Sequence, residues 1–146
     1  LGDRESGKAR SIHMEKVDAE TILEAVNANL AKEARLLTDE AQWYLRVGAT
    51  QAAHGRVVHS KGEYVSQADP TIHTNTVEGF YSVFKRGMKG VYQQASKKHL
   101  HRYLAEFDFR YNYRIALGVN DTARADNILK GVVGRRLTYQ TTGGQA

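Results

Sequence analysis

Residues 73–87 read HTNTVEGFYSVFKRG, and they carry the clearest periodicity in the chain. Four large apolar side chains recur there at i, i+3, i+4 and i+7, namely Val77, Phe80, Tyr81 and Phe84. This spacing is typical of one face of an amphipathic helix. We therefore predict a helix from His73 to about Met88. Gly87 and Gly90 are expected to end it, because glycine favours helix C-termini.

The polar face of this predicted helix holds the candidate chemistry. Asn75, Glu78, Ser82 and Lys85 share one side, opposite part of the aromatic stripe. A plain solvated face is one interpretation. The other is that Glu78 holds a hard divalent cation through oxygen, while Lys85, two turns later, contacts a phosphate. Asn75 is either a neutral ligand or phosphate contact in that site, or a cap of the helix.

A second helix is expected after this one. Ser96 is its predicted cap and it runs to about Arg114, with an apolar face made of Leu100, Tyr103, Leu104, Phe107 and Tyr111. Basic residues gather near its start, namely Lys97, Lys98 and Arg102. They are either a solvated face or phosphate contacts. A last short helix is expected at Ala123–Val133, and residues 141–146 read as a flexible tail.

Towards the N-terminus the patterns predict strands and helices in turn. Two short strands, Leu1–Glu5 and Ala9–Val17, are expected around a turn at Ser6-Gly7-Lys8. The further predicted elements are a helix capped by Asp18 and ending near Ala31, a strand Arg35–Thr38, a helix Ala41–Val47 and a strand Gly55–Val65. The order indicates a mixed α/β fold, with one domain as the simplest organisation.

Asp39 follows the short apolar strand Leu36-Leu37-Thr38. Open α/β folds bind their ligands at the carboxyl ends of strands, so a carboxylate there is a candidate site residue. The alternative is that Asp39 caps the helix that begins near Glu40.

Composition limits the classes of function. The chain of 146 residues has no cysteine, which excludes disulfides and thiolate zinc sites. Its net charge of +5 favours a polyanionic partner such as nucleic acid. No apolar run approaches the roughly 18 residues of a membrane helix, so no membrane is expected. His54, His59 and His73 lack compact metal-binding spacing, and we expect structural or DNA-facing roles for them.

Several long motifs in order resemble the ISXO-like DDE transposases, a family of insertion-sequence enzymes. The central one is HTNTVEGF followed by KRG, within residues 73–87. The others are Thr38-Asp39-Glu40, HSKGEYV at residues 59–65, Gly90-Val91-Tyr92, SKKHL at 96–100, RYLAEF at 102–107, FRYN at 109–112 and GRRLTY at 134–139. The resemblance covers nearly the whole chain.

The resemblance implies a ribonuclease-H-like mixed sheet flanked by helices, here over residues 1–140. It implies that Asp39 and Glu78 are the second and third of three catalytic acids that hold two Mg²⁺ or Mn²⁺ ions. Asn75, Lys85, Arg86, Lys97, Lys98 and Arg102 are the expected DNA contacts. The first acid belongs on a preceding strand that nothing here matches, so the domain is expected to be partial at its N-terminus.

The implied function is metal-dependent DNA strand cleavage and strand transfer in the transposition of an insertion sequence. Its partners would be the transposon ends and the target DNA, with a homo-oligomer on DNA in the bacterial cytoplasm and nucleoid. The alternative is an inactive transposase remnant that folds and binds DNA without catalysis. A ribonuclease-H-like nuclease with another role is disfavoured by the motifs.

Overall fold

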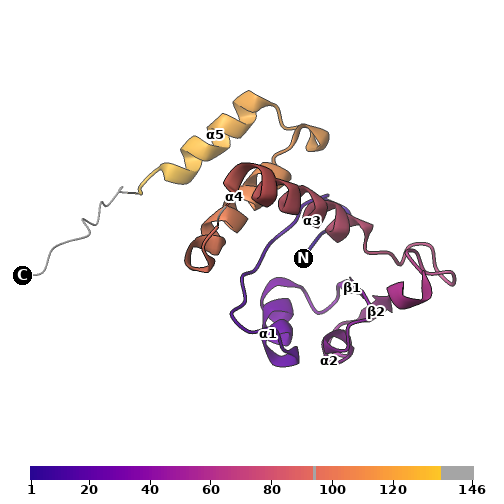
Figure 1. Ribbon diagram of the computed structural model, residues 1–146. Coiled ribbons are helices and arrows are strands. Elements are labelled where there is room, and N and C mark those ends of the chain that lie inside the picture. The colour runs from indigo at the N-terminus through magenta and orange to yellow at the C-terminus, as the bar shows by residue number, and fades with distance from the viewer. Residues whose placement is uncertain (94, 136–146) are drawn as a thin grey trace, which may run out of the picture. The chain divides into compact units, whose positions relative to one another are not determined.

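The computed structural model describes residues 1–93 and 95–135 (Figure 1). The chain forms two compact units, Leu1–Asn112 and a second that begins at Tyr113. The predicted tail at 141–146, and the GRRLTY motif from residue 136 onward, lie outside the described residues. Within the described ranges, no helix is both long and apolar enough to span a membrane.

A small parallel sheet organises the first unit. Strand β1 (Arg35–Thr38) pairs with β2 (Ala53–Arg56) in parallel, with Leu36 opposite His54 and Thr38 opposite Arg56. Helix α2 (Trp43–Gly48) lies between them in sequence. The prediction of a strand at Arg35–Thr38 is confirmed. The described residues therefore have mixed helix and strand structure, with a sheet of two strands.

Helix α1 (Ala19–Asn29) covers this sheet together with α2. The predicted cap is confirmed, because Asp18 Oδ1 accepts hydrogen bonds from Thr21 N at 2.9 Å and Thr21 Oγ1 at 2.6 Å. The buried core of this layer joins α1, β1 and α2 through Ile22, Val26, Leu36 and Val47. Burial of these aliphatic side chains holds the layer together.

The second layer consists of α3 (Asn75–Gly87) and α4 (Leu100–Asn112), joined by aromatic rings. The centroids of Phe80 and Tyr111 are 5.0 Å apart, and those of Phe84 and Phe107 are 5.1 Å apart, both edge to face. Such pairs add to the stabilisation from burial. Phe80 and Phe84 of the predicted apolar stripe thus pack on α4, whereas Tyr81 of the same stripe is exposed.

The N-terminal segment was predicted as two strands, and this is wrong in the described structure. Only an isolated bridge joins Gly2 to Ala9 around the turn. Beyond it, the backbone pairs with side chains of α4 instead of a strand. Asn112 Oδ1 accepts from Ala9 N at 2.7 Å, and Asp108 Oδ2 accepts from Ser11 N at 2.7 Å.

The predicted strand Gly55–Val65 is also wrong in its bounds. β2 ends at Arg56 because its partner β1 ends at Thr38, and Val57 N makes the last bond, to Thr38 O at 3.0 Å. The chain then turns into the 3₁₀ helix η1 (His59–Lys61).

Helix ends differ from the predictions as well. α3 ends at Gly87, close to the predicted Met88, but the chain continues directly into a π-helix, η2 (Met88–Tyr92), that contains Gly90. Ser96 precedes a 3₁₀ helix, η3 (Lys97–His99), which leads into α4. The last helix, α5, spans Asp121–Val132 because Asn120 caps it, its side chain accepting from Ala123 N at 2.8 Å.

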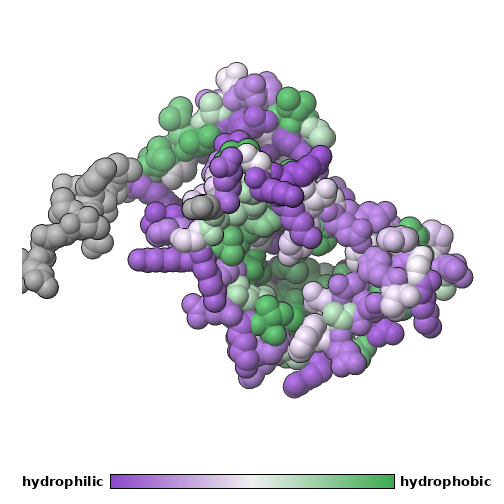
Figure 2. All heavy atoms as spheres, in the orientation of Figure 1, coloured by the Kyte–Doolittle hydropathy of each residue, from purple (hydrophilic) through white to green (hydrophobic). Residues whose placement is uncertain are grey.

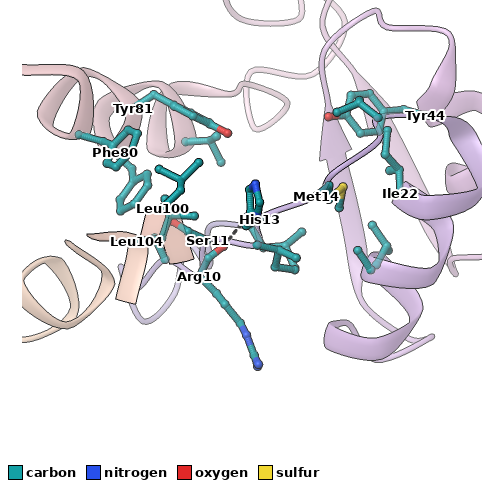
Figure 3. A pocket seen from close by; sticks show the side chains of 18 residues that line it. Arg10, Ser11, His13, Met14, Ile22, Tyr44, Phe80, Tyr81, Leu100 and Leu104 are labelled. Atoms are coloured by element: carbon teal, nitrogen blue, oxygen red, sulfur yellow. Dashed lines mark hydrogen bonds between the residues drawn. The ribbon is translucent and has the colours of Figure 1, made fainter. Parts of the chain in front are cut away.

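A cleft of about 450 Å³ separates the two layers of the first unit. Figure 3 shows Phe80, Tyr81, Leu100 and Leu104 on one side of it, and Met14, Ile22 and Tyr44 on the other. In the space-filling view, hydrophobic atoms surround a hollow at this place (Figure 2). The extended segment that contains Ser11 and His13 crosses between the layers (Figure 3).

Candidate functional site

The carboxyl end of the parallel sheet brings two segments of the sequence together. Asp39 follows β1 directly, and His59 stands three residues after the end of β2. Because parallel strands end at the same edge, both residues belong to one side of the sheet. The Asp39 side chain orders its own loop, since Oδ1 accepts from Ala41 N at 3.0 Å. α2 begins later, at Trp43. Asp39 therefore caps this turn and not the helix.

Glu78 lies in the first turn of α3 and its side chain is about half exposed. The Thr74 hydroxyl, one turn earlier, donates to Glu78 Oε1. His59 Nε2 is 3.4 Å from the same oxygen and 3.3 Å from Thr74 Oγ1. The carboxylate of Glu78 thus contacts His59, which follows β2.

A second link joins the loops after the two strands. The Glu40 carboxylate accepts from Ser60 N at 3.1 Å and from Ser60 Oγ at 2.7 Å. Glu40 adjoins Asp39, and Ser60 adjoins His59. The two loops therefore hold each other at a fixed spacing.

Tyr44 of α2 provides a third connection. Burial raises the pKa of the Tyr44 phenol, and the nearby Asp39 carboxylate and Tyr81 add to this rise. Tyr81 belongs to α3, and Figure 3 shows it across the cleft from Tyr44. Tyr44 thus lies near both Asp39 and Tyr81 of α3.

The polar face predicted for α3 is present on the protein surface. A shallow hollow is lined by Glu78, Tyr81, Ser82 and Lys85. The structure thus brings three residues of the predicted face together and adds Tyr81 to them. Asn75 does not cap the helix, because Thr74 occupies that position and Asn75 is its first residue.

The remaining predicted DNA contacts are all exposed. Arg86 belongs to the last turn of α3, Lys97 and Lys98 form part of η3, and Arg102 lies in the first turn of α4. Their exposure is compatible with phosphate contact and equally with a solvated surface.

The donor chemistry of the candidate site suits a hard cation. Asp39 and Glu78 offer carboxylate oxygens, which Mg²⁺ prefers. Within the described ranges, however, no three Asp, Glu or His side chains form a group that would hold a metal ion. In the part of the chain that the structure describes, Asp39 and Glu78 thus belong to no such group.

The histidines divide by role. His54 is structural: its Nε2 lies 2.8 Å from Thr38 Oγ1, its ring covers Gly48, and burial lowers its pKa. His59 contacts the candidate acid Glu78, and so does Thr74. Neither contact was predicted from the sequence. One feature of the sequence could have indicated the contact of His59. His59 follows β2 closely, as Asp39 follows β1, and the two strands are parallel.

Comparison with protein families gives a match over most of the first compact unit. The model of the ISXO2-like transposase domain matches residues 2–112, which include Asp39, His59 and Glu78. No match to the chain was found among curated proteins or among solved structures.

Proposed function

Because the chain belongs to the ISXO2-like transposase domain family, we propose that it is the catalytic part of a DDE-type transposase, which cleaves and joins DNA strands. The observation that supports the proposal is the contact of Glu78 with His59, in the loop after β2, because Asp39 follows the parallel strand β1. Ligands of open α/β folds bind at the carboxyl ends of strands. The proposed fold is ribonuclease-H-like.

In this proposal Asp39 and Glu78 hold Mg²⁺ or Mn²⁺ together with at least one further ligand. Bound ions of this kind stabilise the attacking and leaving oxygens of an in-line displacement at phosphorus. The protein's own task is to position the two carboxylates and the DNA, and no covalent protein nucleophile is needed. Lys85, in the hollow beside Glu78, contacts the DNA backbone.

Nicking of supercoiled plasmid DNA by the 146-residue chain in Mn²⁺ tests this function. We expect Asp39→Asn and Glu78→Gln each to abolish nicking, because each removes a charged ligand, while DNA binding measured on filters survives. Glu24→Gln is the matched control, since Glu24 is an exposed carboxylate on α1. Nicking that persists in both site variants would contradict the assignment of these acids.

The incomplete ligand set among the described residues favours one alternative, a chain that folds and binds DNA without catalysis. Titration calorimetry with Mg²⁺ separates the two. Two acids alone should bind the ion weakly. Tight binding that Asp39→Asn abolishes would show that a complete site exists and would exclude the inactive form.

A further inference from the structure

We propose that His59 is a positioning residue, which donates a hydrogen bond to Glu78 and fixes this carboxylate at the sheet edge. The inference rests on the proposed function, because Glu78, which His59 positions, is one of the proposed catalytic acids. It starts from the contact of three side chains, in which His59 Nε2 is 3.4 Å from Glu78 Oε1 and 3.3 Å from Thr74 Oγ1.

The protons in this cluster can be assigned by counting donors. A threonine hydroxyl has a single proton, and Thr74 donates it to Glu78. Towards His59, the Thr74 oxygen can therefore only accept. An ionised Glu78 has no proton to donate either. His59 Nε2 must then carry a proton, which points to Thr74 Oγ1 at 3.3 Å, with Glu78 Oε1 3.4 Å from the same nitrogen.

This assignment also defines what His59 does not do. A histidine ligates a metal through the lone pair of a deprotonated ring nitrogen. Nε2 carries a proton on the side of Thr74 and Glu78, so this nitrogen does not ligate an ion in the described arrangement. Its effect on a metal ion is exerted through the Glu78 carboxylate, as outer partners of ligating carboxylates act.

The loop that carries His59 is itself held by several contacts. Gly62, in the left-handed region at φ 72°, closes η1 with a bond from its N–H to His59 O at 2.9 Å. Val57, two residues before His59, is fully buried. The ring of Tyr64 lies 5.6 Å from the imidazole, centroid to centroid, and Ser60 is bonded to Glu40.

These contacts explain why His59 can position a side chain that is half exposed. A solvated glutamate on a helix surface exchanges among rotamers, and ordering it costs conformational entropy. The loop of His59 is already ordered by its own contacts. Its contact with Glu78 therefore adds little further loss of conformational entropy on the His59 side. Glu78 is thereby preorganised relative to the Asp39–Glu40 loop, to which Ser60 is bonded.

The first readout needs no metal. Three-bond NMR couplings of the Glu78 side chain report its rotamer populations. We expect a single dominant rotamer in the 146-residue chain and in His59→Gln, since the glutamine amide also donates. Averaged couplings are expected in His59→Ala. Identical couplings in His59→Ala and the unchanged chain would overturn the proposal.

The second readout is Mn²⁺ binding, followed by electron paramagnetic resonance of the free ion. We expect His59→Ala to weaken binding by about 10-fold, the lower range for outer partners of metal ligands. His59→Gln should keep most of the affinity, and His101→Ala, which alters an exposed histidine of α4, all of it. Equal losses in His59→Ala and His59→Gln would mean direct ligation and would overturn positioning.

Glu78→Gln separates the two proposals. If this variant binds Mn²⁺ as the unchanged chain does, the metal role of Glu78 fails, while the rotamer couplings still decide the role of His59. If Glu78→Gln loses binding but His59→Ala keeps it, the proposed function stands and the positioning role is refuted. Thermal melting of each variant confirms that the fold is retained, and His59→Gln serves should His59→Ala fail to fold.

Discussion

Lys85 lies two helical turns after Glu78, and both side chains line one hollow on α3. A lysine in this place can contact the phosphate of a DNA strand whose scissile bond is near the acid. Phosphate contacts position the nucleic acid without reading its sequence. The competing interpretation is a solvated charge on an amphipathic helix.

Lys85→Ala distinguishes these interpretations. If Lys85 contacts a phosphate, the variant should bind DNA more weakly, and the slope of log K against log salt should fall by about 1. Filter binding at several salt concentrations measures both. Metal binding should not change, since lysine is not a ligand. Lys32→Ala, at an exposed lysine away from α3, is the control; equal behaviour of the two variants would leave only the solvated charge.

Asp69 gives a residue-scale prediction on stability. Its hydrogen bond with Thr71, and then its ion pair with Arg35 at 2.7 Å, lower its pKa from 3.8 to about 2. Because the folded-state pKa lies below the unfolded one, this stabilisation is present above pH 4 and is lost as the pH falls towards 2. Asp69→Asn should therefore lose less stability than the unchanged chain over this range. Urea unfolding at pH 6 and pH 3 checks this, and equal losses would contradict it.

The sequence predicted best those elements whose bounds are set by residues within or next to the element itself. Asp18 caps α1, and β1 has the predicted bounds, because capping residues and short apolar runs act within a few positions. The bounds of β2 depend on where its partner strand ends, which no local pattern contains. The same holds for the site: Asp39 and Glu78 stood out by position, but the contact of Glu78 with His59 arises from loops distant in sequence.

Gly87 shows how packing decides the role of a glycine within an element. A Cβ at this position would lie 2.1 Å from Phe107 Cζ, so the missing side chain lets α3 and α4 approach. Phe107 is buried and its ring contacts Phe84 and Tyr92, which leaves little room for a shift.

Gly87→Ala should accordingly destabilise the protein by about 1–3 kcal/mol through overpacking. Gly79→Ala is the matched control, since it lies in the same helix and its Cβ would meet nothing within 4 Å. There the gain in helix propensity should stabilise by roughly 0.5–1 kcal/mol. Urea unfolding of both variants measures the difference. A stabilised Gly87→Ala would show that the ring of Phe107 moves aside readily.

At the scale of the whole molecule, two boundaries coincide. The first compact unit ends at Asn112, and the family match ends at the same residue. Asn112 also connects the two ends of this unit, because its side chain bonds both backbone groups of Ala9. The core, the aromatic contacts between α3 and α4, and the candidate site all belong to residues 1–112.

A chain shortened after Arg114 should therefore fold by itself. We expect its amide NMR signals for residues up to about 105 to match those of the full chain, with a similar thermal midpoint. Extending the chain two residues past Asn112 keeps the Ala9 contact away from the new terminus. Loss of signal dispersion in the short chain would mean that the first unit needs the second to fold.

The cleft between the layers has a thermodynamic consequence. Its apolar lining, which includes Met14, Val17 and Leu104, borders a space of about 450 Å³. Side chains that face such a space are partly hydrated in the folded state, so unfolding transfers less new apolar surface to water. The heat capacity increment should then fall below the usual 12–15 cal/mol/K per residue or so. A smaller increment flattens the stability curve, so this protein would unfold over a broad temperature interval and would resist cold denaturation.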